Sequence, residues 1–248
     1  MSIPSPICCA RGWRGRMPRR RSSAAPERVA VADLYFGSLD VAEDELERLA
    51  KLLDPAERAR AARFAFARDR RRFIVRRARL RETLAMATGA AAERLVYTEN
   101  AYGKPALAGG PKFSASHSHE LWVVAVSDRE LGVDLEYHQP EIDWRDLAAG
   151  LFGAGECAAL DALAEDDAIR GFFDCWARKE AFVKAIGMGL SYPLDAFAVS
   201  VTPEARLLAG AEGWRIAGFA LAEGYSGALV IADDGAPVRI ATPPHRSP

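Results

Sequence analysis

Two carboxylates lie two positions apart in segment 131–137, whose other residues are mostly apolar. In a β-strand, side chains at positions i and i+2 point to the same face, so Asp134 and Glu136 would project side by side. Neighbouring carboxylates on a buried strand repel each other unless a cation lies between them. A hard divalent cation such as Mg²⁺ prefers oxygen ligands and accepts phosphate oxygens as well. The pair therefore indicates either a Mg²⁺ site or the solvated face of a half-exposed hairpin.

A second polar set lies in segment 172–186, where apolar residues recur at helical spacing. Glu180 and Lys184 are four positions apart, in the order that stabilises an exposed helix. Lys179 falls within the apolar stripe, where a lysine can extend its ammonium group to solvent. The many aromatic residues around this set argue against a fully solvated face. A third carboxylate near the first two, with lysines beside it, would form a site for a metal ion and a phosphate.

A third set lies in segment 113–118, with the sequence Phe-Ser-Ala-Ser-His-Ser. Serine and histidine side chains and backbone amides in such a segment are good donors to phosphate. A Ser–His pair also suits a nucleophile for acyl transfer, but the segment lacks the Gly-x-Ser-x-Gly context and an identifiable acid partner. Phosphate binding by Ser116 and His117 is therefore favoured, the alternative being a loop histidine with ordinary hydrogen bonds.

These polar sets must be positioned by the helices and strands around them. Apolar residues at a period of 3.6 predict a long helix over 69–88, which Gly89 would end. Asp54 and Pro55 are typical first residues of an earlier helix. Further helices are expected within 40–68 and over 144–150, 154–165 and 168–187, and strands over 29–36, 121–126, 131–136 and within 196–232.

Charge is distributed unevenly along the 248 residues, although the net charge is only −1. Residues 1–28 contain seven arginines and one acid, whereas the remainder holds 26 basic and 33 acidic residues. The body is therefore not a general polyanion binder, and any anion site in it requires a local cluster of cations. The arginine-rich segment is expected to be a disordered extension, with a transit peptide or a nucleic-acid-binding arm as alternatives.

Cysteine spacing and hydropathy limit the cellular compartments in which the protein is expected. The four cysteines show neither CxxC nor Cys/His spacing, which argues against a zinc site or a disulfide framework and favours a reducing cytoplasm. No apolar run approaches the roughly 18 residues of a membrane span, and the start of the chain lacks the apolar core of a secretory signal. We therefore expect a cytoplasmic protein without a membrane or nucleic-acid partner.

Taken together, the three polar sets resemble the 4'-phosphopantetheinyl transferase superfamily, in its larger, surfactin-synthetase-type branch. The resemblance covers about residues 52–200. Each matching segment is short, but unrelated chains would not accumulate all of them in this order. The segments are 102–105 (Tyr-Gly-Lys-Pro), 113–118, 132–136, 176–184, 187–190 and 193–197.

The resemblance implies an activity and a set of catalytic roles. Family members transfer 4'-phosphopantetheine from coenzyme A to a serine of an acyl- or peptidyl-carrier protein and release 3',5'-ADP. By position, Asp134, Glu136 and Glu180 would bind Mg²⁺ against the pyrophosphate of coenzyme A. Glu180 would activate the carrier serine, directly or through a water, and Lys184 would offset charge on the leaving group.

The resemblance also implies contacts to coenzyme A. Ser116 and His117, with a basic residue such as Arg60, would bind the 3'-phosphate. Glu156 corresponds to another acidic residue near the reactive centre. The full set of expected coenzyme A contacts is Arg60, Arg72, Lys104, Ser116, His117, Lys179 and Lys184.

The fold implied by the resemblance is α+β, with two similar halves forming a pseudo-dimer within one chain. The active site would lie between the halves, and the protein would be a monomer. The expected division is a disordered extension over 1–28, an N-terminal half over 29–130, a C-terminal half carrying the metal site over 131–240, and a frayed tail over 241–248.

Two positions depart from the family pattern. Ser114 lies where the family often has asparagine. Glu57 lies where the family can carry a phosphate-binding lysine, so that phosphate contacts there would rest on three nearby arginines, Arg58, Arg60 and Arg63.

The sequence leaves several alternatives open. The arginine stripe Arg72/Arg76/Arg79 could face an acidic carrier domain, coenzyme A or solvent. The same carboxylates would also suit a two-metal nuclease or phosphatase, although the acidic body and scarcity of histidine argue against one. A nucleic-acid-binding module would depend on residues 1–28.

Overall fold

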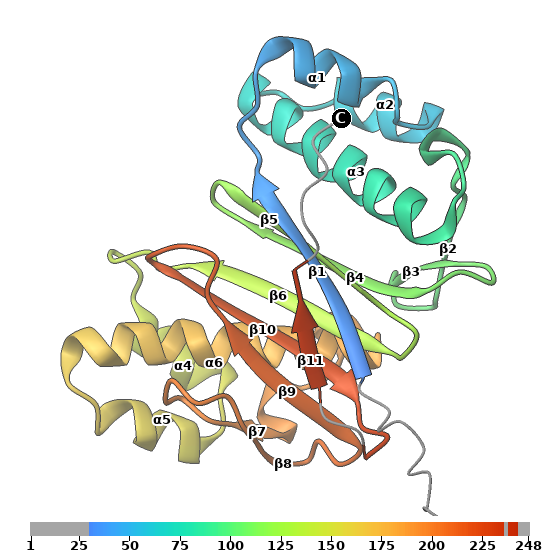
Figure 1. Ribbon diagram of the computed structural model, residues 1–248. Helices are drawn as coiled ribbons and strands as arrows, with labels where there is room; N and C mark the ends of the chain where they lie inside the picture. The colour runs from blue at the N-terminus through green and yellow to red at the C-terminus, as the bar shows by residue number, and fades with distance from the viewer. Residues whose placement is uncertain (1–29, 236–237, 243–248) are drawn as a thin grey trace, which may run out of the picture.

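The computed structural model describes residues 30–235 and 238–242, whose elements form four layers (Figure 1). Two β-sheets pack face to face at the centre, and helices cover the outer side of each. The strand order is β11-β1-β5-β4 in the first sheet and β6-β10-β9 in the second. These strands are β1 (Ala30–Ser38), β4 (Lys112–Ser118), β5 (Leu121–Ser127), β6 (Leu131–Tyr137), β9 (Trp214–Phe219), β10 (Tyr225–Ala232) and β11 (Val238–Ala241).

The two halves follow the same path. In each, a first strand leads to a long helix and then to an antiparallel hairpin, whose second strand pairs antiparallel with the first strand. The first half runs through β1, helix α3 (Ala67–Thr88) and β4–β5, and the second through β6, helix α6 (Glu165–Ile186) and β9–β10. Both helices have 22 residues and end at a glycine with a φ of 72°. The predicted α+β fold of two similar halves is therefore confirmed.

Shorter helices complete the outer layers. Helices α1 (Glu43–Ala50) and α2 (Pro55–Ala62) lie with α3, and α4 (Trp144–Leu151) and α5 (Ala154–Asp161) lie with α6. Helix α2 begins as predicted at Asp54, whose side chain accepts from the Glu57 N–H while the Glu57 carboxylate accepts from the Asp54 N–H. The remaining elements are β2 (Tyr97–Glu99), β3 (Pro105–Leu107), β7 (Ala198–Val199) and β8 (Leu207–Ala209), with 3₁₀ turns at Ala92–Arg94, Gly189–Ser191 and Leu194–Ala196.

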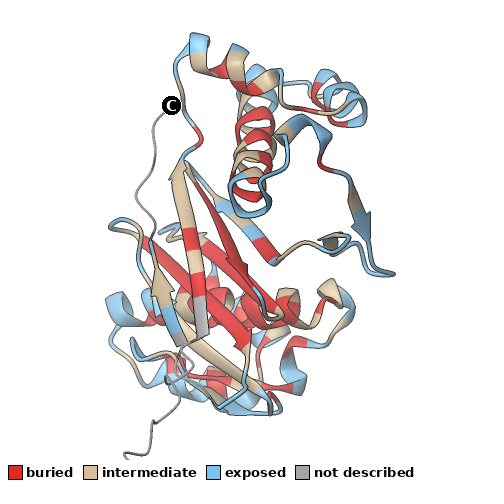
Figure 2. Cartoon of the chain, turned by 45° about the vertical axis from the view of Figure 1, so that its right-hand side comes forward, coloured by how far each residue is buried: buried red, intermediate tan, exposed pale blue. Residues whose placement is uncertain are grey.

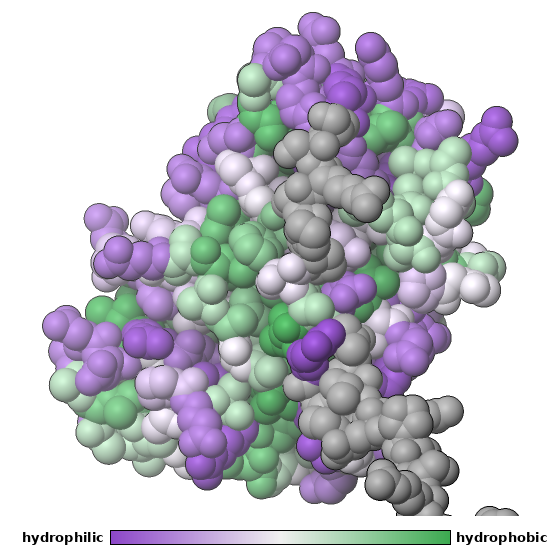
Figure 3. All heavy atoms as spheres, in the orientation of Figure 1, coloured by the Kyte–Doolittle hydropathy of each residue, from purple (hydrophilic) through white to green (hydrophobic). Residues whose placement is uncertain are grey.

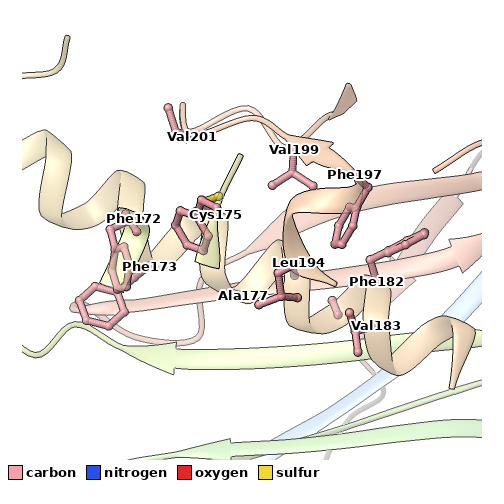
Figure 4. Close-up of a cluster of buried hydrophobic side chains, with 14 of the residues drawn as sticks. Phe172, Phe173, Cys175, Ala177, Phe182, Val183, Leu194, Phe197, Val199 and Val201 are labelled. Carbon is pink, nitrogen blue, oxygen red and sulfur yellow. The ribbon is translucent and has the colours of Figure 1, made fainter. Parts of the chain in front are cut away.

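Three apolar cores hold the layers together, and the buried residues of the central strands and long helices are red in Figure 2. One lies between α3 and the first sheet, and a second lies between the two sheets. The third surrounds α6, where aromatic side chains pack against the segment that follows the helix (Figure 4). There the rings of Phe182 and Phe197 lie with centroids 4.4 Å apart. Burial of these apolar surfaces is the main stabilising contribution to the fold.

Gly132 allows α6 to lie directly on β6. A Cβ atom at this position would lie 2.0 Å from the Ala181 carbonyl oxygen and 2.3 Å from the Ala185 nitrogen. Only a residue without a side chain fits between the strand and the helix backbone at this distance. The close approach brings the turn of α6 that carries Lys184 next to Asp134 on β6.

The last strand departs from the expected division of the chain. Strand β11 pairs parallel with β1 and so joins the first sheet, although the sequence division assigned residues up to 240 to the second half. The expected disordered segment 1–28 and residues 243–248 of the expected tail lie outside the described residues. In the part of the chain that the structure describes, no helix combines the length and apolar character needed to cross a membrane.

The substitution Gly132→Ala should destabilise the protein by about 1–3 kcal/mol, because the added methyl group overlaps the backbone of α6. Urea denaturation measures this free energy of unfolding. Gly150→Ala in α4 is the matched control, since a Cβ atom there meets nothing within 4 Å and alanine favours a helix. Equal stability of the two variants would show that the contact between β6 and α6 tolerates a side chain.

Candidate active site

Strand β4 lies beside β6 where the two sheets meet, and three serines at alternate positions of β4 face that strand. The Oγ of Ser114 accepts from the backbone N–H of Val133 at 3.1 Å. The Oγ of Ser118 accepts from the N–H of Tyr137 at 3.0 Å and donates to Glu136 Oε2 at 3.1 Å. We call this contact of Ser114, Ser116 and Ser118 with β6 the serine seam.

The middle serine of the seam brings the three predicted motifs together. Ser116 Oγ donates to Asp134 Oδ1 at 2.7 Å. From α6, Lys184 Nζ donates to the same Asp134 oxygen at 2.5 Å and to Ser116 Oγ at 3.0 Å. Asp134 is only 2% exposed, so this ion pair is shielded from solvent on the carboxylate side. Side chains predicted from β4, β6 and α6 thus meet at one point.

Asp134, Glu136 and Glu180 lie near this point, and the charge of Lys184 does not balance their negative charges. The pKa of Glu136 is raised to about 7, first by burial and then by the neighbouring Asp134. Burial and Asp134 also raise the pKa of Glu180. Lys184 lowers the pKa of both groups, but does not offset burial and repulsion. The cluster formed by Asp134, Glu136 and Glu180 would therefore gain from an added cation.

This carboxylate cluster fits a hard divalent cation. Asp134 Oδ2 is buried and has no hydrogen-bond partner among the described residues. A buried carboxylate oxygen is costly without a partner, and a divalent cation is a partner that accepts such an oxygen as a ligand. Within the described ranges, no three carboxylate, histidine or cysteine side chains already lie in an arrangement that could hold a metal ion. The donor types and the orphaned oxygen therefore support the expected set of ligands, without a preformed geometry.

A cationic cavity of about 440 Å³ lies next to the serine seam, and we call it the arginine cavity. His117, between Ser116 and Ser118 on β4, lines it together with Arg72 and Arg76 from α3. The pKa of His117 is lowered to about 4, first by burial and then by the charges of Arg76, Lys184 and Arg72. His117 is therefore neutral near pH 7 and lies among permanent cations, which is an environment suited to an anion.

Arg60 lies beside the arginine cavity but is not among its lining residues. Its guanidinium group lies 5.5 Å from the ring centre of Phe73, which does line the cavity. Arg72 lines the cavity while bonded to Asp40 and to the carbonyl oxygen of His119. The expected cavity residues Arg60, Arg72 and His117 are thus brought together.

Lys104 lies apart from Arg60, Arg72 and His117. Its Nζ donates to Glu130 at 3.2 Å and to the carbonyl oxygens of Leu131 at 3.2 Å and Ala185 at 2.8 Å. It lines a separate cavity of about 320 Å³ that shares no residue with the arginine cavity. The expected contact between Lys104 and the phosphates of coenzyme A stays a prediction, and in this structure the ammonium group is bonded to protein oxygens.

Lys179, another expected contact, lies in the core of this structure. It is fully buried, and its Nζ lies 2.8 Å from Glu156 Oε2 and donates to the carbonyl oxygens of Leu194 and Phe197. Glu156, expected near the reactive centre, also accepts from the backbone N–H of Val199. This buried pair ties α5 and α6 to the segment after α6, so neither member reaches a ligand.

Ion pairs occupy several of the charged residues near the arginine cavity. Arg79 pairs with Glu45 and Glu82, so the stripe of three arginines on α3 is not a free cationic face. Glu57 is buried and paired with Arg77 and Arg81, so it points away from the arginine cavity. Arg58 donates to the carbonyl oxygen of Leu53, which leaves Arg60 as the α2 arginine seen beside the cavity.

Sequence reasoning did not anticipate the serine seam. The signal was present, since the three serines of segment 113–118 recur at the period of a β-strand. The residue types of this segment predict phosphate binding, whereas two of its serines also bond to carboxylates of β6.

The metal-free protein should lose stability as the pH rises from about 5 to about 8. In the folded state the pKa of Glu136 is about 7, against an ordinary 4.5, so the folded protein binds more protons in this window. The free energy of unfolding then falls with increasing pH. Thermal unfolding across this range in the presence of a chelator should show a steeper decline for the wild type than for Glu136→Gln. Parallel declines would contradict the raised pKa.

Lys179→Met should destabilise the protein by about 3–5 kcal/mol, because it leaves Glu156 buried without its cation. Urea denaturation measures this, and the double variant Lys179→Met/Glu156→Gln should recover part of the loss. Unchanged stability together with weakened binding of coenzyme A would contradict this structural role and indicate that Lys179 contacts coenzyme A.

Comparison with known proteins connects these features to one family. Residues 130–229 match the model of the 4'-phosphopantetheinyl transferase superfamily, and residues 40–129 match that of the N-terminal part of 4'-phosphopantetheinyl transferases. The chain is 36% identical over 185 residues to the 4'-phosphopantetheinyl transferase HetI of Nostoc sp., an alignment that covers 72% of this chain and 78% of HetI. It is 31% identical over 165 residues to the 4'-phosphopantetheinyl transferase psf-1 of Bacillus pumilus, covering 66% and 70% of the two chains. Sfp of Bacillus subtilis is 28% identical over 161 residues, covering 64% and 71%. The chain therefore belongs to the 4'-phosphopantetheinyl transferase superfamily, in its larger branch.

Proposed function

We propose that this enzyme transfers 4'-phosphopantetheine from coenzyme A to a serine hydroxyl of an acyl- or peptidyl-carrier protein and releases 3',5'-ADP. The observation that supports this most is the convergence of three carboxylates, Lys184 and the serine seam beside a cationic cavity. The relatives at 36% and 31% identity carry the name of this activity. The site offers one region for a metal-bound pyrophosphate and another for a separate phosphate.

The carboxylate cluster would hold Mg²⁺ through Asp134, Glu136 and Glu180. A bound Mg²⁺ would offset negative charge on the pyrophosphate of coenzyme A. The unpartnered Asp134 Oδ2 and the raised pKa values of Glu136 and Glu180 support this assignment. Ser116 and Ser118 would fix the orientation of the Asp134 and Glu136 carboxylates through their hydrogen bonds.

Glu180 would accept the proton of the carrier serine, directly or through a water. Burial and Asp134 raise the pKa of Glu180, which brings its basicity closer to the operating pH. Lys184 would offset charge on the leaving 3',5'-ADP, since its ammonium group lies at the junction of the carboxylate cluster and Ser116. The products then separate as a phosphopantetheinyl serine and 3',5'-ADP.

Coenzyme A would extend from the carboxylate cluster toward the arginine cavity. Ser116 and His117 on β4, with Arg60 and Arg72, would bind its 3'-phosphate. Lys104 and Lys179 are the other expected contacts to coenzyme A, and their ammonium groups are bonded within the protein in this structure.

We further propose that the enzyme acts as a cytoplasmic monomer without a nucleic-acid partner. Both halves that form the site belong to one chain, so a second copy is not needed to complete it. The described cysteines, Cys157 and Cys175, are free, as expected in a reducing compartment. The acidic body gives no general attraction to nucleic acid.

The decisive experiment incubates an apo carrier protein with this enzyme, coenzyme A and Mg²⁺, and measures the intact mass of the carrier. A gain of one phosphopantetheine group, dependent on Mg²⁺, is expected. Asp134→Ala and Glu180→Gln should each lower turnover by about 10²–10⁴-fold, because each removes a group that acts on the reacting phosphate or the nucleophile. Glu165→Gln is the matched control, since this carboxylate also lies on α6 but pairs with Arg145 at the surface.

Two results would overturn the proposal. Wild-type turnover in Asp134→Ala and Glu180→Gln would show that the carboxylate cluster is not the catalytic centre. Release of 3',5'-ADP at an equal rate without a carrier protein would identify the enzyme as a hydrolase.

A further inference from the structure

Lys184 lies in the last turn of α6, which ends at Gly187. The last carbonyl groups of a helix have no partner within the helix, so this end frays unless other groups bond to it. Inside α6, the Gly187 N–H donates to the Val183 carbonyl oxygen at 3.0 Å. The position of the Lys184 ammonium group beside Asp134 and Ser116 therefore depends on how the following carbonyl groups are held.

The β2–β3 hairpin of the first half supplies partners for this helix end, through residues 100–104, which we call the capping turn. Asn100 Nδ2 donates to the Gly187 carbonyl oxygen at 2.8 Å, and Lys104 Nζ donates to the Ala185 carbonyl oxygen at 2.8 Å. A Cβ atom on Gly187 would lie 2.9 Å from Lys104 Cδ and 3.0 Å from Asn100 Nδ2, so the two segments are in close contact. A positive charge and an N–H donor both suit the negative end of a helix dipole.

Asn100 uses both ends of its side-chain amide. Its Oδ1 accepts from the backbone N–H groups of Tyr102 and Lys104, each at 2.9 Å, and so shapes the capping turn. Its Nδ2 is then the group that reaches Gly187. Hydrophilic residues dominate the surface over α1–α3 (Figure 3), whereas Asn100 and Lys104 direct their polar groups to the end of α6. One exposed asparagine thus links the shape of a turn in the first half to a helix of the second half.

The capping turn and the serine seam hold Lys184 from two directions. Ala185, which follows Lys184 directly, is bonded through its carbonyl oxygen to Lys104. The Lys184 ammonium group itself donates to Ser116 and Asp134. Most of α6 is fixed independently by the apolar core around it. Loss of the capping bonds would therefore loosen the last turn and Lys184 with it, while the rest of the helix stays in place.

We propose that Asn100 is a positioning residue for the transfer reaction, because it caps α6 and so holds Lys184 at Asp134 and Ser116. This inference rests on the proposed function and deepens it. Neither the resemblance nor the family matches assign a role to Asn100. The residue acts through the helix end and needs no contact with coenzyme A or with the carrier protein.

Asn100→Asp tests this in the full chain. The variant keeps the acceptor oxygen that shapes the capping turn, but replaces the donor to Gly187 by a negative charge at the negative end of α6. It should lower kcat by about 3- to 10-fold, as expected for the loss of one hydrogen bond, and keep the KM for coenzyme A. Hydrogen–deuterium exchange should become faster in residues 183–188 and stay unchanged in the first turns of α6.

Thr98→Val is the matched control, since Thr98 lies on β2 of the same hairpin and its hydroxyl donates to the Ala106 carbonyl oxygen across that hairpin. It should match the wild type in both turnover and exchange. Wild-type turnover and exchange in Asn100→Asp would overturn the inference.

A double-mutant cycle with Lys184→Met separates positioning of Lys184 from a general loss of stability. If Asn100 acts through Lys184, Asn100→Asp should lower kcat in the wild type but cause no further loss in Lys184→Met. Equal fold losses in both backgrounds would overturn the inference. Failure of the wild type to modify any carrier protein would instead overturn the proposed function, and the exchange measurement would still test the cap.

Discussion

The buried carboxylate of Asp134 is the interaction on which the rest of the site depends. One of its oxygens accepts from Ser116 on β4 and from Lys184 on α6, so a strand of the first half and a helix of the second meet on a single atom. Burying a charged group is costly unless it is paired; the ion pair with Lys184 forms within the second half, and the first half adds the hydrogen bond from Ser116. The second oxygen has no partner among the described residues. Folding thus positions the carboxylate and leaves part of its bonding capacity for a ligand.

The geometry that produces this meeting point comes from two local sequence features. Gly132 lets the backbone of α6 approach β6 so closely that no side chain fits between them. The serine seam brings β4 to the other side of β6 through side chains, without a ladder of backbone bonds. Serine is short enough to bridge two strands in this way and can donate and accept at once. The two sheets therefore join along β4 and β6 by polar contacts, while apolar side chains fill the space between their faces.

Much of this arrangement could be predicted from sequence, and the failures have physical causes. The period-2 spacing of Asp134 and Glu136 and the helical spacing of Glu180 and Lys184 indicated the carboxylate cluster before any contact was known. Lys179 and Glu180 are adjacent in the chain, but neighbouring residues on a helix point about 100° apart, so Lys179 lies in the core while Glu180 lies near Asp134. The return of β11 to β1 joins segments about two hundred residues apart, and no local pattern encodes such a pairing. Lys104 belongs to a motif that is recognisable in the sequence. Its hydrogen-bond partners could not be predicted, because they lie on β6 and α6, which only the folded chain brings together.

The distribution of charge around the site explains why one ligand can satisfy both of its regions. Carboxylates of β6 and α6 lie near Ser116, and Arg60 and Arg76, whose guanidinium groups have no ion pair among the described residues, lie around the arginine cavity. Glu57 does not weaken the cationic side, because its charge is turned inward to Arg77 and Arg81. The acidic region requires a cation and the basic region requires an anion, so each is electrostatically incomplete alone. Coenzyme A carries a pyrophosphate that can share a metal ion with the carboxylates and a distant phosphate that can enter the arginine cavity. Under the proposed function, its two phosphate groups would thus correct opposite imbalances that the ion pairs Lys184–Asp134 and Arg72–Asp40 leave in the two regions.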